Sequence, residues 1–193
     1  RCCEKSGCAL SLKKTHLGTA EIDCLGHLIT RSGRCAADKK IDLVQGWPLP
    51  TTTAALRSFF CVCVYLREYI FRFADKTYPL KKYLRGKGAA PISSFASDPE
   101  AVRAFKLLKR SLQNRATLAA IDYAGAQAYQ ETGKGLQITI DASRFGYSFC
   151  ISQSQGFGKA PRICVYRGKS FNDRERGWST LERELYGFLY FIE

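Results

Sequence analysis

The sequence predicts an α+β protein in which a β-hairpin and a helical segment are followed by three antiparallel strands and a further helix. Residues 20–33 alternate apolar and polar side chains, as a half-buried hairpin does. Residues 53–70 repeat apolar side chains every three or four positions, which is the helical period. Residues 136–170 then contain three runs rich in β-branched and aromatic residues, and residues 180–193 return to helical spacing.

The first half is predicted to be helical after its hairpin, which Ser32-Gly33 should close. A short helix is expected in residues 38–46 and should stop at the segment WPLP, because proline interrupts backbone hydrogen bonding. Thr51 to Thr53 offer a cap for a long helix that should reach Ile70. Several arginines lie among its apolar residues and could reach phosphates or form a solvated face: Arg57, Arg67 and Arg72.

A second helix start is predicted at Asp98-Pro99, with the aspartate as cap and proline at the first helical position. Its apolar stripe should run to about Asn114. Residues 121–135 are rich in Ala, Gly and Gln and have the composition of a linker. The sequence therefore divides into residues 1–120, this linker, and residues 136–193.

The net charge is +13, from 30 Lys and Arg against 17 Asp and Glu, which favours a polyanionic partner such as nucleic acid or an anionic membrane surface. Most of this excess falls before residue 136, so the positive surface charge should lie mainly on the first part of the chain. A basic protein without such a partner remains the alternative.

The composition makes several other classes of protein improbable. The nine cysteines have no regular spacing, so we expect reduced thiols and no structural zinc. The longest apolar run, FFCVCVYL, is too short to cross a bilayer, so no membrane partner and an intracellular location are expected. Phosphate-binding loops, nucleophile elbows and zinc-peptidase motifs are missing. The absence of methionine suggests a piece of a longer reading frame.

Asp141 and Glu184 are the candidate catalytic residues. Asp141 ends an apolar strand, where a carboxylate is costly unless it is solvated, paired or bound to a cation. A helix packed across the strands could bring Glu184 over the strand end, and clustered carboxylates suit Mg²⁺. The alternatives stay open: Asp141 could cap the strand, and Glu182 and Glu184 could simply favour the positive end of the helix.

Several phrases, in order, resemble the reverse transcriptases of gypsy-type LTR retrotransposons and their retroviral relatives. CLGHLITRSG is similar to the family's primer-grip hairpin, and KKIDLVQGWPLPTTTAALRSFF and YLREYIFRFADKTYPLKKYL to its thumb helices. AFKLLKRSLQNRATLAAIDY resembles the connector helix, and LQITIDASRFGYSFCISQ and WSTLERELYGF resemble the first strands and a helix of the ribonuclease H domain. The resemblance covers nearly the whole chain and selects Glu184 over Glu182.

The resemblance implies a function for each part. The hairpin and helical thumb would hold an RNA–DNA hybrid or DNA duplex, with Gly26 and His27 at the primer-facing turn. Candidate phosphate contacts are Lys13, Lys14, Arg31, Arg34, Lys39, Lys40 and Arg57. Residues 136–193 would start a ribonuclease H-like fold in which Asp141 and Glu184 bind two Mg²⁺ ions together with two further carboxylates beyond Glu193. An upstream palm and fingers polymerase domain in the same polyprotein would be a partner, and a cytoplasmic particle or the nucleus the location.

Cys61, where the family prefers glycine, and Tyr186-Gly187 depart from the family pattern and suggest a divergent copy. A degenerate or domesticated remnant that only binds nucleic acid or a protein therefore stays open as a second interpretation. A structural helical protein with a basic face is a third.

Overall fold

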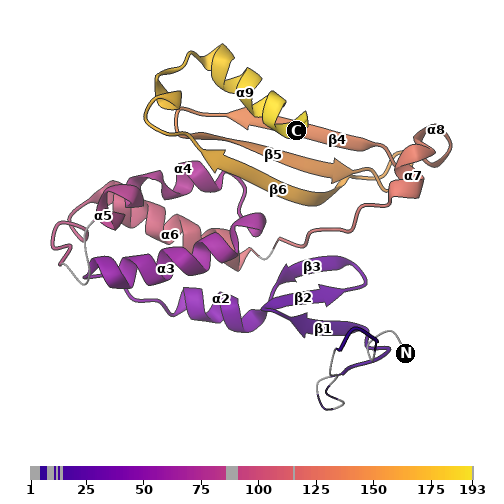
Figure 1. Ribbon diagram of the computed structural model, residues 1–193, viewed down its shortest axis with the longest axis horizontal. Helices are drawn as coiled ribbons and strands as arrows, with labels where there is room; N and C mark the ends of the chain where they lie inside the picture. The colour runs from indigo at the N-terminus through magenta and orange to yellow at the C-terminus, as the bar shows by residue number, and fades with distance from the viewer. Residues whose placement is uncertain are drawn as a thin grey trace.

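The computed structural model describes residues 5–7, 11, 13, 15–85, 91–114 and 116–192. Within them, two three-stranded antiparallel sheets lie on opposite sides of a helical body (Figure 1). The α+β class predicted from the sequence is therefore confirmed.

The first sheet contains β1 (Glu21–Cys24), β2 (His27–Thr30) and β3 (Gly33–Ala36), in that order. The β1–β2 turn consists of Leu25 and Gly26, which both have positive φ, at 52° and 75°. Such two-residue turns match the natural twist of a hairpin. The predicted hairpin is correct, but β3 was not predicted, because Ser32-Gly33 was interpreted as the end of the sheet instead of a second turn.

The helical body is built on α2 (Asp38–Gln45), α3 (Thr53–Tyr65) and α6 (Pro99–Gln113). Thr52 caps α3 by accepting a hydrogen bond from the backbone of Ala55, and Asp98 caps α6 in the same way. Both predicted helix starts are therefore confirmed, as is the end of α6 next to Asn114. Between α3 and α6 the chain forms η2 (Arg67–Tyr69), α4 (Phe73–Thr77), η3 (Tyr78–Leu80) and α5 (Lys81–Leu84).

The long helix predicted to reach Ile70 is wrong in its extent, because α3 ends at Tyr65. Leu66 leaves the helical conformation with ψ near 10°, and a 3₁₀ turn follows. Leu66 and Ile70 are nevertheless buried, at 0% and 2% exposure. The apolar spacing therefore identified the buried residues correctly, although it could not reveal the break in the helix.

Aromatic and aliphatic side chains form one core inside the helical body. The rings of Phe59 on α3 and Phe105 on α6 lie 4.4 Å apart, and Trp47 meets Phe59 edge-on at 5.9 Å. Aliphatic residues that are almost fully buried complete this cluster: Val44, Leu56, Leu66, Leu80, Leu108 and Leu112. The first half of the chain therefore has its own hydrophobic core.

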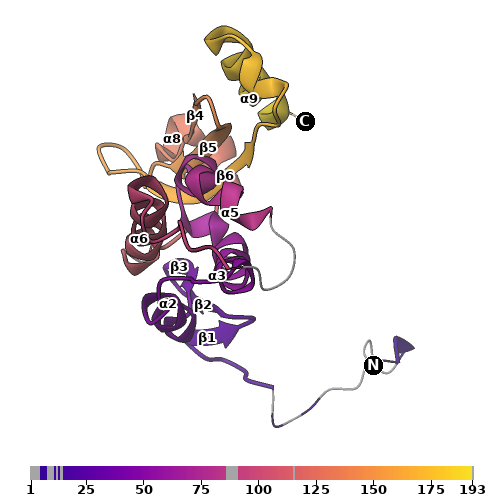
Figure 2. The same ribbon diagram turned by 90° about the vertical axis from the view of Figure 1, so that its left-hand side faces the viewer.

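The second sheet contains β4 (Leu136–Ala142), β5 (Gly146–Gln153) and β6 (Arg162–Ser170), in that order. After η4 (Glu175–Gly177), helix α9 (Thr180–Ile192) crosses the outer face of this sheet, while the helical body lies on its inner side (Figure 2). Gly187 makes the close approach of α9 possible, since an added Cβ there would lie 3.2 Å from Tyr147 and 3.4 Å from Ile140. The predicted three strands and helix are thus present.

Residues 121–135, which were predicted to form a linker, contain α7 (Tyr123–Gln127) and α8 (Tyr129–Thr132). Gln153 at the end of β5 holds this segment in place. Its buried side chain accepts from the backbone of Asp122 and donates to the carbonyls of Asp122 and Lys134, at 2.8, 2.8 and 3.0 Å. Linker composition did not reveal this docking because the buried amide lies far away in the sequence.

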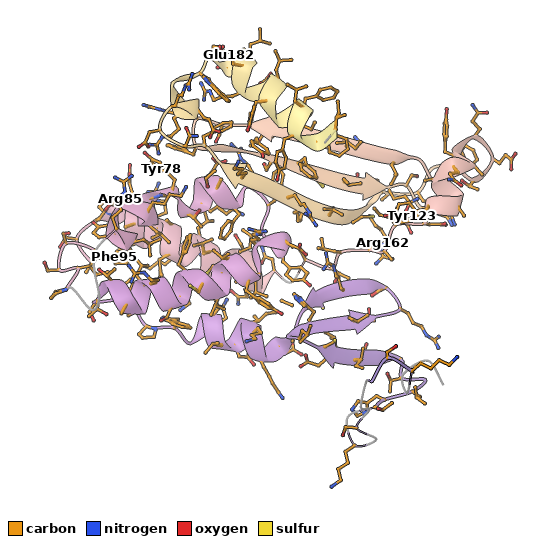
Figure 3. The ribbon with its side chains drawn as sticks, in the orientation of Figure 1. Tyr78, Arg85, Phe95, Tyr123, Arg162 and Glu182 are labelled. Carbon is orange, nitrogen blue, oxygen red and sulfur yellow. The ribbon has the colours of Figure 1, made fainter. Side chains whose placement is uncertain are left out.

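The two sheets are joined through a short extended segment after α6. The backbones of Arg34 in β3 and Leu118 exchange two hydrogen bonds of 2.8 Å, and Ala119 donates to Ile163 of β6 at 2.8 Å. Gly33 permits this approach, because an added Cβ would lie 2.1 Å from the carbonyl oxygen of Leu118. Arg162 of β6 adds a hydrogen bond to the carbonyl of Ser32 (Figure 3).

Candidate functional site

Asp141 lies on β4 opposite Ser148 of β5 and faces the helical body. Its neighbour Ile140 meets Gly187 of α9, and successive side chains of a strand point to opposite faces. The carboxylate of Asp141 accordingly lies 3.1 Å from Nε of Arg72, at the start of α4. Its side chain is 39% exposed, so the group remains accessible to solvent.

Glu184 is exposed and belongs to α9, which covers the other face of the sheet. The side chain of Asp141 therefore lies on one face of the second sheet, whereas the helix that carries Glu184 covers the other face. Among the described residues, no group of three or more His, Cys, Asp or Glu is arranged to hold a metal ion. Asp141 is paired with the guanidinium of Arg72, and the metal site that it was predicted to share with Glu184 stays a prediction.

Glu182, the competing carboxylate on α9, has a structural function (Figure 3). It accepts a hydrogen bond of 2.6 Å from the backbone of Ser179, whose hydroxyl accepts one of 3.2 Å from the backbone of Glu182. This reciprocal arrangement is a capping box, and the bond from Ser179 lowers the pKa of Glu182. Glu182 therefore stabilises the start of the helix, as one of the two interpretations proposed, and Glu184 remains the candidate metal ligand.

Arg72 connects the predicted catalytic strand to the helical body. Its Nε donates to Asp75 at 2.7 Å and also lies next to Asp141, and Asp75 accepts a short hydrogen bond from the hydroxyl of Ser143. The hydrogen bond to Asp75 is the main cause that raises the pKa of Arg72. From its sequence, Arg72 was expected to contact phosphate or to belong to a solvated face, and nothing in its spacing indicates this network.

The backbone of Arg72 is in the left-handed conformation, at φ 55° and ψ 44°. For a residue with a Cβ this conformation costs about 1–2 kcal/mol. Neighbouring aromatic contacts hold it on both sides, since Phe71 packs on Tyr166 of β6 and Phe73 packs on Phe60 of α3. The strained position therefore lies at the junction between the helical body and the second sheet.

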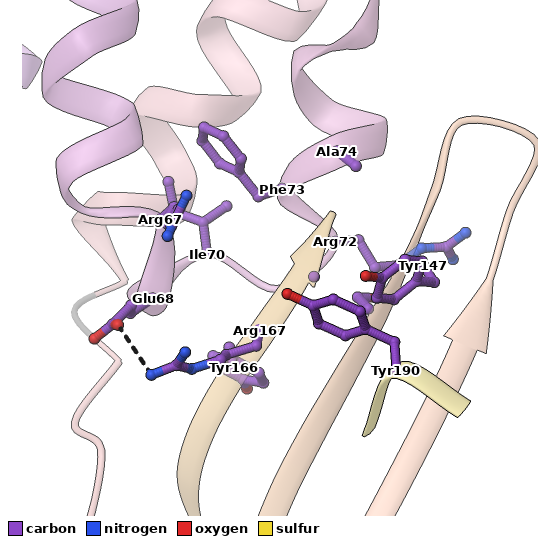
Figure 4. Close-up of a pocket in the computed structure, with 12 residues that line it drawn as sticks. Arg67, Glu68, Ile70, Arg72, Phe73, Ala74, Tyr147, Tyr166, Arg167 and Tyr190 are labelled. Atoms are coloured by element: carbon purple, nitrogen blue, oxygen red, sulfur yellow. Dashed lines mark ion pairs between the residues drawn. The ribbon is translucent and has the colours of Figure 1, made fainter. Parts of the chain in front are cut away.

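A small hollow of about 80 Å³ opens beside this junction, between η2, α4 and the second sheet (Figure 4). Glu68 faces Arg167 across it at 4.0 Å, and the hydroxyl of Tyr147 is buried there without a hydrogen-bond partner. Burial raises the pKa of Tyr147. The hollow is too small for a nucleotide, since binding pockets for ligands of that size measure about 300–1,000 Å³.

The predicted primer-facing residues are held by two tyrosines. His27 contacts the hydroxyl of Tyr69 through Nδ1 at 2.8 Å and that of Tyr65 through Nε2 at 3.0 Å. Tyr65 donates a short hydrogen bond to the carbonyl of Leu25, and its hydroxyl would lie 3.6 Å from a Cβ at Gly26. The hairpin turn is therefore fixed against the helical body through His27, a function that sequence reasoning did not identify.

The predicted phosphate contacts differ in their surroundings. Arg34 pairs with Glu68 at 2.7 Å, Lys40 lies over the ring of Tyr65 at 5.8 Å, and Arg57 donates to the carbonyl of Leu84 at 3.1 Å. Lys14 lies outside the described residues. Three others are exposed: Lys13, Arg31 and Lys39.

Two further basic groups were missed. Arg103, Lys106 and Arg110 form an exposed row on α6, and their spacing of three and four residues could have been found in the sequence. Lys81 on α5 lies in a hollow of about 410 Å³ with Arg176 of η4. Burial, and then the charge of Arg176, lowers the pKa of Lys81. Lys81 and Arg176 lie far apart in the sequence, so their proximity could not be predicted from it.

Residues 98–193 match the family model described as "RNase H-like domain found in reverse transcriptase". The chain is 27% identical over 196 aligned residues to the "Retrovirus-related Pol polyprotein from transposon opus" and 29% identical over 183 to that from transposon 412, both of Drosophila melanogaster. These alignments cover 98% and 95% of this chain but only 18% and 14% of the relatives.

A solved structure gives a similar result. The foamy viral protease-reverse transcriptase in complex with RNA/DNA hybrid matches 94% of this chain and 23% of its own, with a TM-score of 0.69 and 22% identity. This likeness shows the fold. Residues 98–193 thus match a ribonuclease H-like domain of reverse transcriptases, and the chain is similar to retrotransposon Pol polyproteins, as its sequence resemblance predicted.

No helix in the described part of the chain is long and apolar enough to cross a membrane.

Proposed function

We propose that this chain holds the primer–template duplex of an RNA-directed DNA polymerase and contributes to its ribonuclease H. The observation that carries the proposal is the excess of basic side chains, with a net charge of +13 and the exposed row of Arg103, Lys106 and Arg110 on α6. Phosphate contacts of this kind are independent of sequence and position a duplex by its backbone. The similar foamy viral protease-reverse transcriptase was solved in complex with double-stranded DNA and with RNA/DNA hybrid, which supports the same partner.

In the proposed nuclease, Asp141 and Glu184 would each contribute a carboxylate to a site for two Mg²⁺ ions. Such ions activate water and stabilise the leaving oxygen when the RNA strand of a hybrid is cut. Within this chain, Ser143 and the β4–β5 turn hold the strand end that carries Asp141, and the Ser179–Glu182 capping box begins the helix that carries Glu184. The polymerase domain and the remaining carboxylates would come from other parts of the Pol polyprotein, in an intracellular particle or the nucleus.

Binding is tested by titrating a fluorescent RNA–DNA hybrid with the full chain at several salt concentrations. We expect the logarithm of the binding constant to fall linearly with the logarithm of the salt concentration. Lys106→Gln should reduce the slope by about 0.9, the value for one lost phosphate contact. Lys159→Gln, an exposed lysine in the β5–β6 loop, is the matched control and should leave the slope unchanged. A binding constant that does not change with salt concentration would contradict the proposal.

Hydrolysis is tested in a protein extended along its reading frame at both ends. With Mg²⁺ it should degrade the RNA of a hybrid, and Asp141→Asn should abolish this activity because a metal ligand is lost. Asp23→Asn, an exposed carboxylate on β1, controls for the loss of one negative charge. Full activity of the Asp141 variant would reject the assignment.

A remnant that only binds nucleic acid is the second candidate. The observation that favours it is the ion pair between Asp141 and Arg72, on the face of the sheet opposite α9. This candidate predicts salt-dependent hybrid binding together with no hydrolysis in the extended protein.

A further inference from the structure

A basic hollow lies where α5 meets η4, the turn before α9. Its volume is about 410 Å³, and Tyr78 and Arg85 lie on its helical-body side (Figure 3). Binding pockets for small ligands measure about 300–1,000 Å³, so a phosphate group has room here. Six charged side chains line the hollow, four basic and two acidic: Lys81, Lys82, Arg85, Glu100, Asp173 and Arg176. The lining therefore has an excess of positive charge, which favours an anion.

Arg176 is held in this hollow by its neighbours. Its guanidinium lies 5.4 Å from the centre of the Tyr78 ring, and that ring stacks on Phe145 at 3.9 Å. Arg176 also pairs with Asp173, and its side chain is only 22% exposed. A guanidinium carries several N–H donors in a planar fork. One ion pair therefore leaves N–H groups that a ligand in the hollow can use.

Lys81 lies near Arg176 and has no acidic partner in the described part of the chain. Burial and then the charge of Arg176 lower the pKa of Lys81, and no carboxylate among the described residues offsets them. The other lysine of α5, Lys82, is by contrast paired with Asp98 at 2.5 Å. Lys81 and Arg176 repel each other because they carry like charges. An anion bound between them would remove that repulsion.

We propose that Lys81 and Arg176 together bind one phosphate group at the junction between the helical body and the second sheet. A phosphate suits both side chains, since lysine binds it as a point charge and arginine through parallel N–H groups. The site lies at the sheet edge where β4 ends, because the Tyr78 ring next to Arg176 stacks on Phe145 of the β4–β5 turn. Neither Lys81 nor Arg176 was predicted as a phosphate contact.

The phosphate comes either from the backbone of a bound nucleic acid or from a free phosphate ion. The first source rests on the proposed function, because it assumes that the chain holds a duplex. The second source does not depend on it.

The first test titrates the full chain with inorganic phosphate and follows the side-chain NMR signal of Lys81. Phosphate should raise the pKa of Lys81, because a bound anion favours the charged ammonium. Lys81→Gln should weaken phosphate binding about tenfold, the loss expected for one hydrogen bond between charged groups. Lys81→Arg keeps the charge and should remain near the wild type. Lys159→Gln, an exposed lysine in the β5–β6 loop, is the matched control and should change nothing.

A second titration, with the fluorescent RNA–DNA hybrid, identifies the source of the phosphate. If Lys81→Gln weakens the binding of both inorganic phosphate and hybrid, the site holds the nucleic-acid backbone. If it weakens the binding of inorganic phosphate alone, the site takes free phosphate.

Inorganic phosphate that does not bind, that binds the wild type and Lys81→Gln equally, or that leaves the pKa of Lys81 unchanged would overturn the inference. The proposed function fails separately, through hybrid binding that does not depend on salt concentration.

Discussion

Helices α6 and α9 are both amphipathic, but their outer faces differ. The apolar side of α6 is buried against the helical body, and its outer side carries the basic row. On α9 only Gly187 is buried, and large apolar side chains remain 50–66% exposed: Leu181, Leu185, Phe188, Leu189 and Ile192. The helical body therefore buries its apolar side chains in its own core, whereas α9 on the second sheet leaves large apolar side chains exposed to solvent. We infer that most of the stability of this chain resides in the helical body.

The largest expected effect is on the free energy of unfolding, and it is tested by replacing one buried and one exposed phenylalanine. Phe59 is fully buried and Phe188 is 50% exposed. Phe59→Ala should lower the free energy of unfolding by about 3–5 kcal/mol, because it removes a core ring and leaves a cavity. Phe188→Ala should cost less than about 1 kcal/mol, since little buried surface is lost. Urea denaturation measures both, and equal losses would contradict the inferred difference between the two helices.

A smaller effect is expected at Gln153, which is 2% exposed and makes three hydrogen bonds to the segment before β4. Gln153→Leu leaves buried backbone groups without partners and should cost about 1–3 kcal/mol. Gln137→Leu on the exposed part of β4 is the control and should change stability little. If both variants unfold at the same urea concentration, the docking of α7 and α8 contributes nothing to the stability of the second sheet.

The smallest effect concerns Tyr69, where burial is the main cause that raises the pKa to about 12 from an ordinary value of 10. The unfolded chain loses the phenolic proton first, so stability should be complete below about pH 10 and fall between pH 10 and 12. Tyr69→Phe removes the hydrogen bond to His27 and should cost about 1 kcal/mol at pH 7. The stability of this variant should also fall less than that of the wild type between pH 10 and 12. Urea denaturation at each pH measures this difference.

Local signals in the sequence predicted much of the fold. Asp98-Pro99 fixed the start of α6 because the cap and the first helical turn depend on adjacent residues. The apolar spacing from Leu56 to Ile70 found buried positions but not the break at Leu66, since a 3₁₀ turn keeps much of the same periodicity. Strand β3 was missed although it pairs with the neighbouring β2, because the Ser32-Gly33 turn was interpreted as the end of the sheet. The docking of α7 depends on Gln153, which lies far along the chain, and no local pattern reports it.

The same limit applies to the candidate site. Strand position and family resemblance selected Asp141 and Glu184 as candidates, which stay a prediction, and the capping box explains why Glu182 is the less suitable candidate. The ion pair of Asp141 was not predictable, because Arg72 joins it through a left-handed backbone and tertiary contacts. The tyrosines that hold His27 were likewise missed, since their hydroxyls meet the imidazole only after the hairpin has packed on α3 and η2.

The extended segment at Leu118 and Ala119 has a mechanical consequence. Its backbone is hydrogen-bonded to β3 on one side and to β6 on the other, so the second sheet cannot rotate away from the hairpin without breaking these bonds. If the hairpin holds a duplex as proposed, these hydrogen bonds would limit how far the second sheet can move relative to that duplex. The segment thus links the two sheets through backbone hydrogen bonds.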